Sequence, residues 1–317
     1  MNIQPRLAAQ PDFPTDLLGY AMSAFYGGRA EVHLRHVEAP VAVVDFTSMY
    51  PTVDILMGIW RLVTTERVET VGVTDEVTAL LATVTADDCF NPARWPEFVA
   101  LVEIVPDGDI VPVRADYRDE DWSIGVNPLH GDQPLWYTLP DLIASKLLSG
   151  RTPDVRRALR FLPSGGSQPG LQAVNLQGRL PVDPHQHDFF QRVVESRQQT
   201  RRSVPGHAHD SCPCPPCRLA RFLKVLANSG SYGIYAEMIR HEHPDTVTVH
   251  GPTGRPFTVK VAAPEEPGEY CFPPIAACIT GAARLMLALL ELSITDAGGA
   301  WIFWADSSQR RNRTGSD

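Results

Sequence analysis

The chain has 317 residues, of which 44% are hydrophobic and 21% charged, a composition that is ordinary for a soluble globular protein. This length is sufficient for two or three compact units. The formal net charge of −9 argues at first against a nucleic-acid partner.

Three features predict a cytoplasmic protein without a membrane partner. The longest apolar run, residues 275–290, is interrupted by Arg284, so no uninterrupted run is long enough to span a bilayer. Residues 1–20 lack the basic start and the apolar core of a signal peptide. The six cysteines, three of which lie within six positions, do not resemble an extracellular disulfide framework.

The charge is distributed unevenly along the chain. Residues 64–122 hold 14 acidic and 4 basic side chains, and this net of −10 accounts for the whole imbalance. Residues 190–224 hold 7 basic and 2 acidic side chains. Such a local basic stretch is what a polyanion would contact, although a solvated helix face is the alternative.

A predicted short helix over residues 13–25 leads into the sequence Tyr-Gly-Gly-Arg at residues 26–29. The paired glycines allow the backbone to turn or to approach a ligand closely. The flanking Tyr26 and Arg29 could stack on a base and contact a phosphate, and a plain turn is the alternative. Residues 31–36 are predicted to form a strand that pairs with residues 42–45.

The next segment combines an apolar run with a carboxylate. Residues 41–44 read as a buried strand. Asp45 stands at its end, where burial of an unpaired charge would be costly, so it should meet water, a cation or a metal. Residues 48–51 then turn the chain into a predicted helix over residues 53–62.

The middle of the chain carries several local signals. Residues 101–105 and 110–114 predict a hairpin around a Pro-Asp-Gly-Asp turn. Residues 139–148 predict a helix that Thr138 caps and Gly150 ends. We expect a second, basic helix over residues 151–160 and a loop over residues 163–170.

Two helices, residues 187–202 and 218–228, are joined by a short loop and predict a protruding helical hairpin. Arg197 and Arg201 lie four apart on the first helix and share one face. The guanidinium fork suits the oxygens of a triphosphate, and a solvated face is again the alternative.

The loop of this hairpin offers five soft metal ligands within eleven positions. Zn²⁺ takes four such groups in a tetrahedron. The sequence predicts a zinc site made of the three cysteines and one histidine, and a compact turn without metal is the alternative. The five candidate ligands are His207, His209, Cys212, Cys214 and Cys217.

Strands at residues 246–250 and 258–262 precede a predicted long amphipathic helix over residues 275–292. Residues 300–304 form an apolar strand pattern. The last dozen residues are polar and basic, and we expect them to be disordered.

Residues 45–51 resemble the D-x-x-S-L-Y-P motif of family B DNA polymerases, with Met49 in the Leu position. Residues 26–29 resemble the Y-x-G-G motif of that family, and residues 224–233 its K-x-x-x-N-S-x-Y-G motif with one extra residue. The third motif, D-T-D-S, is reduced to a single carboxylate, Asp306. The resemblance covers about residues 20–60 and 185–308.

This resemblance implies an α+β fold, in which a palm with a central antiparallel sheet carries fingers made of a helical hairpin. It implies template-directed deoxynucleotidyl transfer with two Mg²⁺ ions on Asp45 and Asp306, and primer-template DNA and deoxynucleoside triphosphates as partners. The nucleotide-binding residues that it implies are Phe46, Ser48, Met49, Tyr50, Arg197, Arg201, Lys224 and Asn228. The template-binding residues that it implies are Tyr26, Gly27, Gly28, Arg29, Tyr232 and Gly233.

The predicted organisation is palm at 1–62, an acidic insertion or extension of palm and fingers at 63–184, fingers at 185–236 and palm again at 237–317. We expect no exonuclease domain or thumb and a truncated reading frame, so that the chain alone is inactive. A chain that carries the exonuclease or thumb is a candidate partner. One alternative is a non-catalytic remnant that binds nucleotide or primer-template. Another is a zinc-stabilised interaction module.

Overall fold

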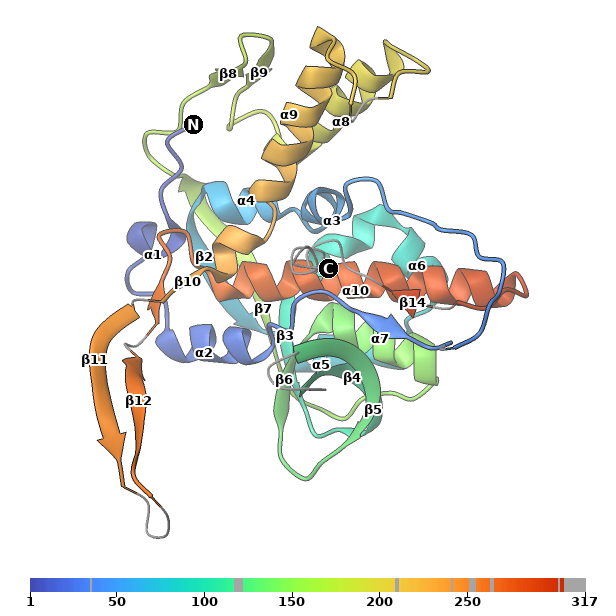
Figure 1. Ribbon diagram of the computed structural model, residues 1–317, viewed down its shortest axis with the longest axis vertical. Helices are drawn as coiled ribbons and strands as arrows, with labels where there is room; N and C mark the ends of the chain where they lie inside the picture. The colour runs from blue at the N-terminus through green and yellow to red at the C-terminus, as the bar shows by residue number, and fades with distance from the viewer. Residues whose placement is uncertain are drawn as a thin grey trace.

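Figure 1 shows a computed structural model of the chain, which describes residues 1–34, 36–116, 122–208, 211–240, 242–250, 255–262, 265–301 and 303–304. Its helices are α1 Arg6–Ala9, α2 Thr15–Ser23, α3 Met49–Met57, α4 Ile59–Thr64, α5 Thr74–Thr83, α6 Ala86–Phe90, α7 Leu139–Ser149, α8 Phe189–Arg202, α9 Pro215–Ser229 and α10 Pro273–Asp296, with 3-10 turns η1 Pro92–Phe98 and η2 Gly233–Ala236. Its strands are β1 Glu31–Val32, β2 Thr65–Gly72, β3 Ala100–Ile104, β4 Asp107–Asp116, β5 Trp122–His130, β6 Leu135–Thr138, β7 Val155–Ser167, β8 Val174–Leu176, β9 Leu180–Val182, β10 Met238–Ile239, β11 Glu242–Val249, β12 Phe257–Ala262, β13 Glu266–Pro267 and β14 Phe303–Trp304.

The centre of the molecule is a four-stranded sheet with the order β2-β7-β3-β6. Every neighbouring pair in it is antiparallel. Consecutive residues of β3, Leu101 and Val102, are both fully buried. Because successive side chains point to opposite faces, both faces of this strand are covered.

Helix α10 crosses the middle of the molecule, as Figure 1 shows, and packs against α2, α3 and α7 as well as the sheet. Its first ten residues are all buried. Gly281 permits a close approach to α7, since a Cβ at this position would lie 2.0 Å from Oγ1 of Thr138. The apolar face of α10 is therefore the scaffold on which the sheet and the surrounding helices assemble.

By length and composition alone α10 could cross a membrane, with 24 residues and a mean hydropathy of 1.8 over its most apolar window. However, 72% of that window is buried inside the fold. Arg284, near its middle, is itself 2% exposed and paired with a carboxylate. These are the properties of a core helix.

A buried ion pair joins α10 to α7. Nε and Nη2 of Arg284 donate to the two carboxylate oxygens of Asp141 at 2.7 and 2.8 Å. Thr138 Oγ1 donates to Asp141 at 2.7 Å, and Arg284 Nη1 also donates to the backbone carbonyl of Gly27. The guanidinium therefore fixes three segments that are distant in sequence.

Two hairpins project from this body (Figure 1). Helices α8 and α9 lie side by side at one end. The antiparallel strands β11 and β12 form a ribbon at the other end.

The predicted fold class is confirmed, because the chain is a mixed structure of helices and strands with a central antiparallel sheet. The predicted helices at 13–25, 139–148, 187–202, 218–228 and 275–292 correspond to α2, α7, α8, α9 and α10. Thr138 caps α7 by accepting from Asp141 N, and Gly150 ends it in the left-handed conformation, as the sequence predicts. Strands β11 and β12 overlap the ranges predicted at 246–250 and 258–262, and β14 covers Phe303 and Trp304 of the strand predicted at 300–304.

The helix predicted at 151–160 and the loop predicted at 163–170 are both wrong, because β7 runs from Val155 to Ser167. This strand pairs with β2 on one edge and β3 on the other. Two-sided pairing satisfies its backbone, and burial of Ala158 and Phe161 outweighs the helix propensity of its arginines.

The hairpin predicted from residues 101–105 and 110–114 is also wrong. Both segments are strands, but β3 pairs with β6 and β7, whereas β4 pairs with β5 in a separate ribbon. Gly108, with φ of 82°, lies in an irregularity at the start of β4. The glycine signal thus marks a bulge and not the tip of a hairpin.

Residues 41–44 do not form the predicted buried strand. Val41, Val43 and Val44 are exposed at 53, 78 and 67%, and this segment is irregular. The predicted pairing of residues 31–36 with 42–45 is wrong as well, since β1 pairs with β14. A strand of this kind is buried only when neighbouring elements cover its apolar side chains. Among the described residues, no strand pairs with residues 41–44.

The helix predicted at 53–62 is interrupted at Gly58, which takes a left-handed conformation between α3 and α4. The acidic range 63–184 supplies all four strands of the central sheet. Its interpretation as an insertion or extension of palm and fingers stays a prediction.

We expect Arg284→Met to lower the free energy of unfolding by roughly 3–5 kcal/mol, because it leaves the buried Asp141 carboxylate unpaired. Denaturant unfolding followed by circular dichroism measures this change. The control is Arg156→Ala, which removes an exposed pair with Asp154 and should cost less than about 1 kcal/mol. Equal effects of the two substitutions would contradict the importance of the buried pair.

Candidate functional site

The turn before α3 holds Ser48 in a left-handed conformation, with φ of 56° and ψ of 49°. This conformation is uncommon for a residue other than glycine and costs on the order of 1–3 kcal/mol. Two contacts maintain it: Arg197 Nη1 donates to Ser48 Oγ at 2.8 Å, and Thr52 N donates to Ser48 O at 2.9 Å. Strain of this kind tends to occur at binding and catalytic sites.

The helical hairpin is held by a second hydrophobic core, which is separate from the one around α10. Asp188 caps α8 by accepting from Gln191 N at 3.1 Å. Phe190 and Val193 on α8 pack with Leu223 on α9. The apolar residues of both helices recur every three or four positions, so each helix buries one face and exposes the other.

The motif at residues 45–51 and the motif at residues 224–233 meet at the base of this hairpin. The ring of Tyr50 stacks on that of Tyr232, with centroids 4.3 Å apart and an interplanar angle of 28°. Together with the contact between Arg197 and Ser48, this stack places the turn at 45–51 against the first helix of the hairpin and the segment after the second. The resemblance implies nucleotide binding for Ser48, Tyr50 and Arg197 and template binding for Tyr232, and neither contact is predicted by the sequence.

The remaining predicted nucleotide-binding residues lie around this junction. Lys224 and Asn228 are both exposed on α9, about 100° around the helix from buried Leu223 and Ala227. Arg201 is exposed in the last turn of α8, one turn beyond Arg197. Phe46 and Met49 are partly buried, and Met49 packs against the main core. Their convergence on one nucleotide stays a prediction.

The segment at 26–29 is held by contacts within the fold. Tyr26 stacks on Tyr137 at 5.7 Å. Arg29 is 2% exposed, and its guanidinium pairs with Glu31 at 2.8 Å and Glu291 at 3.0 Å. A role of Tyr26, Gly27, Gly28 and Arg29 in template binding stays a prediction, as does that of Tyr232 and Gly233.

The predicted magnesium site is described only in part. Asp45 is exposed in the irregular segment before α3, and Asp306 lies outside the described residues. Within the described ranges, no group of three or more His, Cys, Asp or Glu side chains that could hold a metal includes Asp45. The two-metal site that the resemblance implies on Asp45 and Asp306 therefore stays a prediction.

A different group of ligands gathers at the tip of the hairpin. His207, Cys212, Cys214 and Cys217 place one ligand atom each within 4.8 Å of one another. The backbone N–H of Cys217 lowers the pKa of the Cys214 thiol. His209, the other predicted histidine ligand, lies outside the described residues.

Sequence analysis missed a buried carboxylic acid on α3. Asp54 is fully buried, and neither of its oxygens has a hydrogen-bond partner among the described residues. Burial raises the pKa of Asp54 well above its usual range, and the nearby Asp188 raises it further. The only sequence signal for this burial is a single Asp within an apolar helical run. The same pattern is equally consistent with an Asp on the exposed face of the helix.

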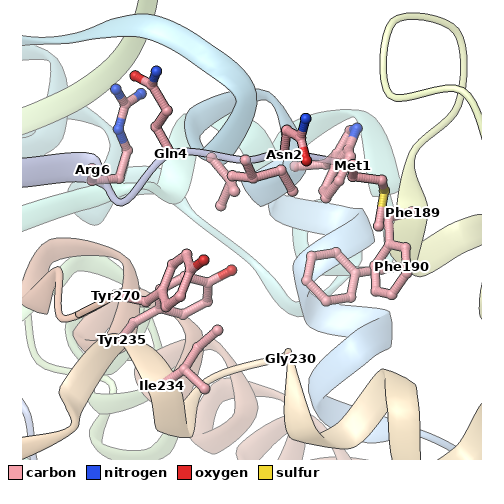
Figure 2. A pocket seen from close by; sticks show the side chains of 13 residues that line it. Met1, Asn2, Gln4, Arg6, Phe189, Phe190, Gly230, Ile234, Tyr235 and Tyr270 are labelled. Atoms are coloured by element: carbon pink, nitrogen blue, oxygen red, sulfur yellow. The ribbon is translucent and has the colours of Figure 1, made fainter. Parts of the chain in front are cut away.

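A cavity of about 430 Å³ lies beside the second core. Figure 2 shows Tyr235 and Tyr270 on one side of it and Phe189 and Phe190 on the other. Arg6, which also lines it, donates to three backbone carbonyls of α4 and β2. Five of the thirteen residues that line the cavity are aromatic, and the guanidinium of its one arginine is already bound to backbone carbonyls, so the cavity does not suit a triphosphate.

Comparison with solved structures finds two matches with low sequence identity. Both are phi29 DNA polymerase. The ternary complex with primer-template DNA and incoming nucleotide substrates shares 14% identity and a TM-score of 0.42, over 92% of this chain and 42% of that chain. The orthorhombic crystal form shares 15% identity and a TM-score of 0.44, over 92% and 43%.

This chain therefore spans less than half the length of the polymerase that it matches. No family model and no curated protein matches it. Since both TM-scores lie below 0.5, the likeness carries no argument for function.

We expect the pH dependence of stability to reveal the neutral form of Asp54. Because its pKa in the folded state is raised, the unfolded state releases this proton first, and stability falls as pH rises above about 4. The loss is at most about 1.4 kcal/mol per pH unit and ends at the folded-state pKa. Asp54→Asn should remove it, so the variant gains stability over the parent as pH rises.

Thermal unfolding between pH 4 and pH 8 tests this expectation. The control is Asp132→Asn, which changes an exposed carboxylate in a turn. Parallel stability curves for Asp54→Asn and the parent would show that Asp54 is ionised in the fold.

Proposed function

We propose that the chain is the palm and fingers of a family B-like DNA-directed DNA polymerase, which binds a deoxynucleoside triphosphate where α3, α8 and α9 meet. The observation that carries this proposal is the contact between two motifs about 180 residues apart, through the stacked rings of Tyr50 and Tyr232. Each motif resembles a nucleotide-binding segment of that family. Their meeting at one place is what a shared site requires.

Charge supports a phosphate site at this junction. Among the described residues, neither Arg201 nor Lys224 has an acidic partner within salt-bridge distance, and both are exposed. Arg197 is bound to Ser48, so it orders the turn from which the backbone of residues 46–49 would contact phosphate oxygens. Cations that face a ligand without a competing carboxylate suit a triphosphate.

The stacked tyrosines support a choice of sugar. Tyr232 fixes the position of the Tyr50 ring, which in the family would lie under the deoxyribose. A 2′-hydroxyl group would collide with a ring held there. Deoxynucleotides are therefore the proposed substrates, and primer-template DNA the proposed partner.

In this proposal Asp45, with Asp306, would hold Mg²⁺, which neutralises charge on the phosphates when bound. A second candidate function, nucleotide binding without transfer, follows from the sequence, in which the third motif retains only one carboxylate, Asp306. Template-dependent primer extension that is abolished by Asp45→Ala would establish the catalytic form. Binding without extension would select the non-catalytic form.

We expect Lys224→Ala to weaken binding of a deoxynucleoside triphosphate by about 1.5–3 kcal/mol, the scale of a hydrogen bond to a charged group. Arg201→Ala should have an effect of similar size. Isothermal titration of the purified chain with dATP in Mg²⁺ buffer measures both.

Each variant has a matched control on its own helix. Arg218→Ala removes a positive charge from α9 about 120° away from Lys224, and Arg202→Ala removes one adjacent to Arg201. Both controls are exposed positions and should leave the affinity almost unchanged. Equal losses from variants and controls would indicate attraction by net charge and would contradict a built phosphate site.

A further inference from the structure

The tip of the helical hairpin gathers four metal-ligating side chains in a short loop. His207 is exposed, Cys212 and Cys214 are half-buried, and Cys217 is buried in the first turn of α9. His207 Nδ1 lies 3.4 Å from Sγ of Cys212, 3.5 Å from that of Cys214 and 3.8 Å from that of Cys217. One nitrogen thus faces three sulfurs at nearly equal distances.

Hydrogen bonds to His207 do not by themselves account for this arrangement. The Nδ1 atom of a neutral imidazole is either one donor or one acceptor, so it can satisfy one thiol well and not three. Three cysteines also cannot all form disulfides with one another, and all three are free. The cluster therefore needs another reason for its compactness.

A shared metal ion supplies that reason. With Zn–S bonds of about 2.3 Å and Zn–N bonds of about 2.0–2.1 Å, a tetrahedral site separates nitrogen from sulfur by about 3.6 Å. The three observed separations bracket this value. Three thiolates and one imidazole are also the soft donors that zinc prefers over Mg²⁺ or Ca²⁺.

We propose that His207, Cys212, Cys214 and Cys217 bind one Zn²⁺ ion in a closed structural site. Four protein ligands complete the tetrahedron and leave no open position, which distinguishes such a site from a catalytic zinc site. The cytoplasmic location that the sequence predicts would keep the thiols reduced and available. This inference goes beyond the proposed function and does not rest on it.

The site would fasten the loop to the start of α9. Cys214 is the N-cap residue of this helix and Cys217 lies in its first turn. Arg221 Nη1 donates to the carbonyl of Cys212 at 2.9 Å, which adds a second link between loop and helix. Lys224 follows Cys217 by seven residues, or about 10 Å along the helix. Zinc would therefore hold the helix that carries this lysine in a fixed register.

Elemental analysis of the full chain, purified and dialysed in metal-depleted buffer, tests the proposal. We expect about one equivalent of zinc per chain, and its release in proportion to modification of three thiols by a mercurial reagent. Less than about 0.1 equivalent with unchanged circular dichroism would overturn it. A mass lower by two hydrogens, which marks a disulfide within the cluster, would also overturn it.

Substitutions localise the ion. Cys212→Ser and His207→Ala should each lower the bound zinc to below about half an equivalent. Cys271→Ser and His185→Ala, which change residues outside the cluster, should retain about one equivalent of zinc.

If a cluster variant does not fold, Co²⁺ titration of the parent chain replaces it, with thiolate-to-cobalt absorption expected to saturate at one equivalent. Absence of this absorption, or full zinc retention in a folded Cys212→Ser variant, would contradict the site.

Discussion

The buried pair between Arg284 and Asp141 is the interaction on which the arrangement of the body depends. A charge in the middle of an otherwise apolar core helix would be costly without a partner. The bidentate contact offsets that cost and simultaneously binds the carbonyl of Gly27. The cation therefore determines how α7 and the segment at 26–29 are placed on α10, and through α10 how α3 and the sheet are placed as well.

The candidate site depends on this body from one side and on the helical hairpin from the other. α3 packs against α10 and also against α8 and α9, so it transmits the position of the core to the hairpin. At its N-terminus the strained Ser48 is maintained by Arg197, and Tyr50 is maintained by Tyr232. At the far end of the hairpin, the proposed zinc site would fasten α9 to its loop. With zinc bound, the exposed cations would belong to a hairpin that is fixed at both its base and its tip.

Sequence patterns predicted the elements whose signals are local. Helix α7 carries its own cap and stop in Thr138 and Gly150, and both act as expected. Strand β7 and residues 41–44 could not be predicted in this way, because their state depends on which distant strands pair with them. For the site, the motifs identified the segments that meet, whereas the Arg197–Ser48 contact and the burial of Asp54 arise only when α3 is placed in three dimensions.

Hydrogen exchange of the backbone amides, with and without a deoxynucleoside triphosphate and Mg²⁺, tests most directly whether the two motifs form one nucleotide site. Exchange reports local opening, and a bound ligand slows it where the ligand holds the backbone. The account predicts slower exchange at residues 46–52 and 224–232 and no change in the ribbon of β11 and β12. Slower exchange at only one motif, or around the aromatic cavity in its place, would contradict it.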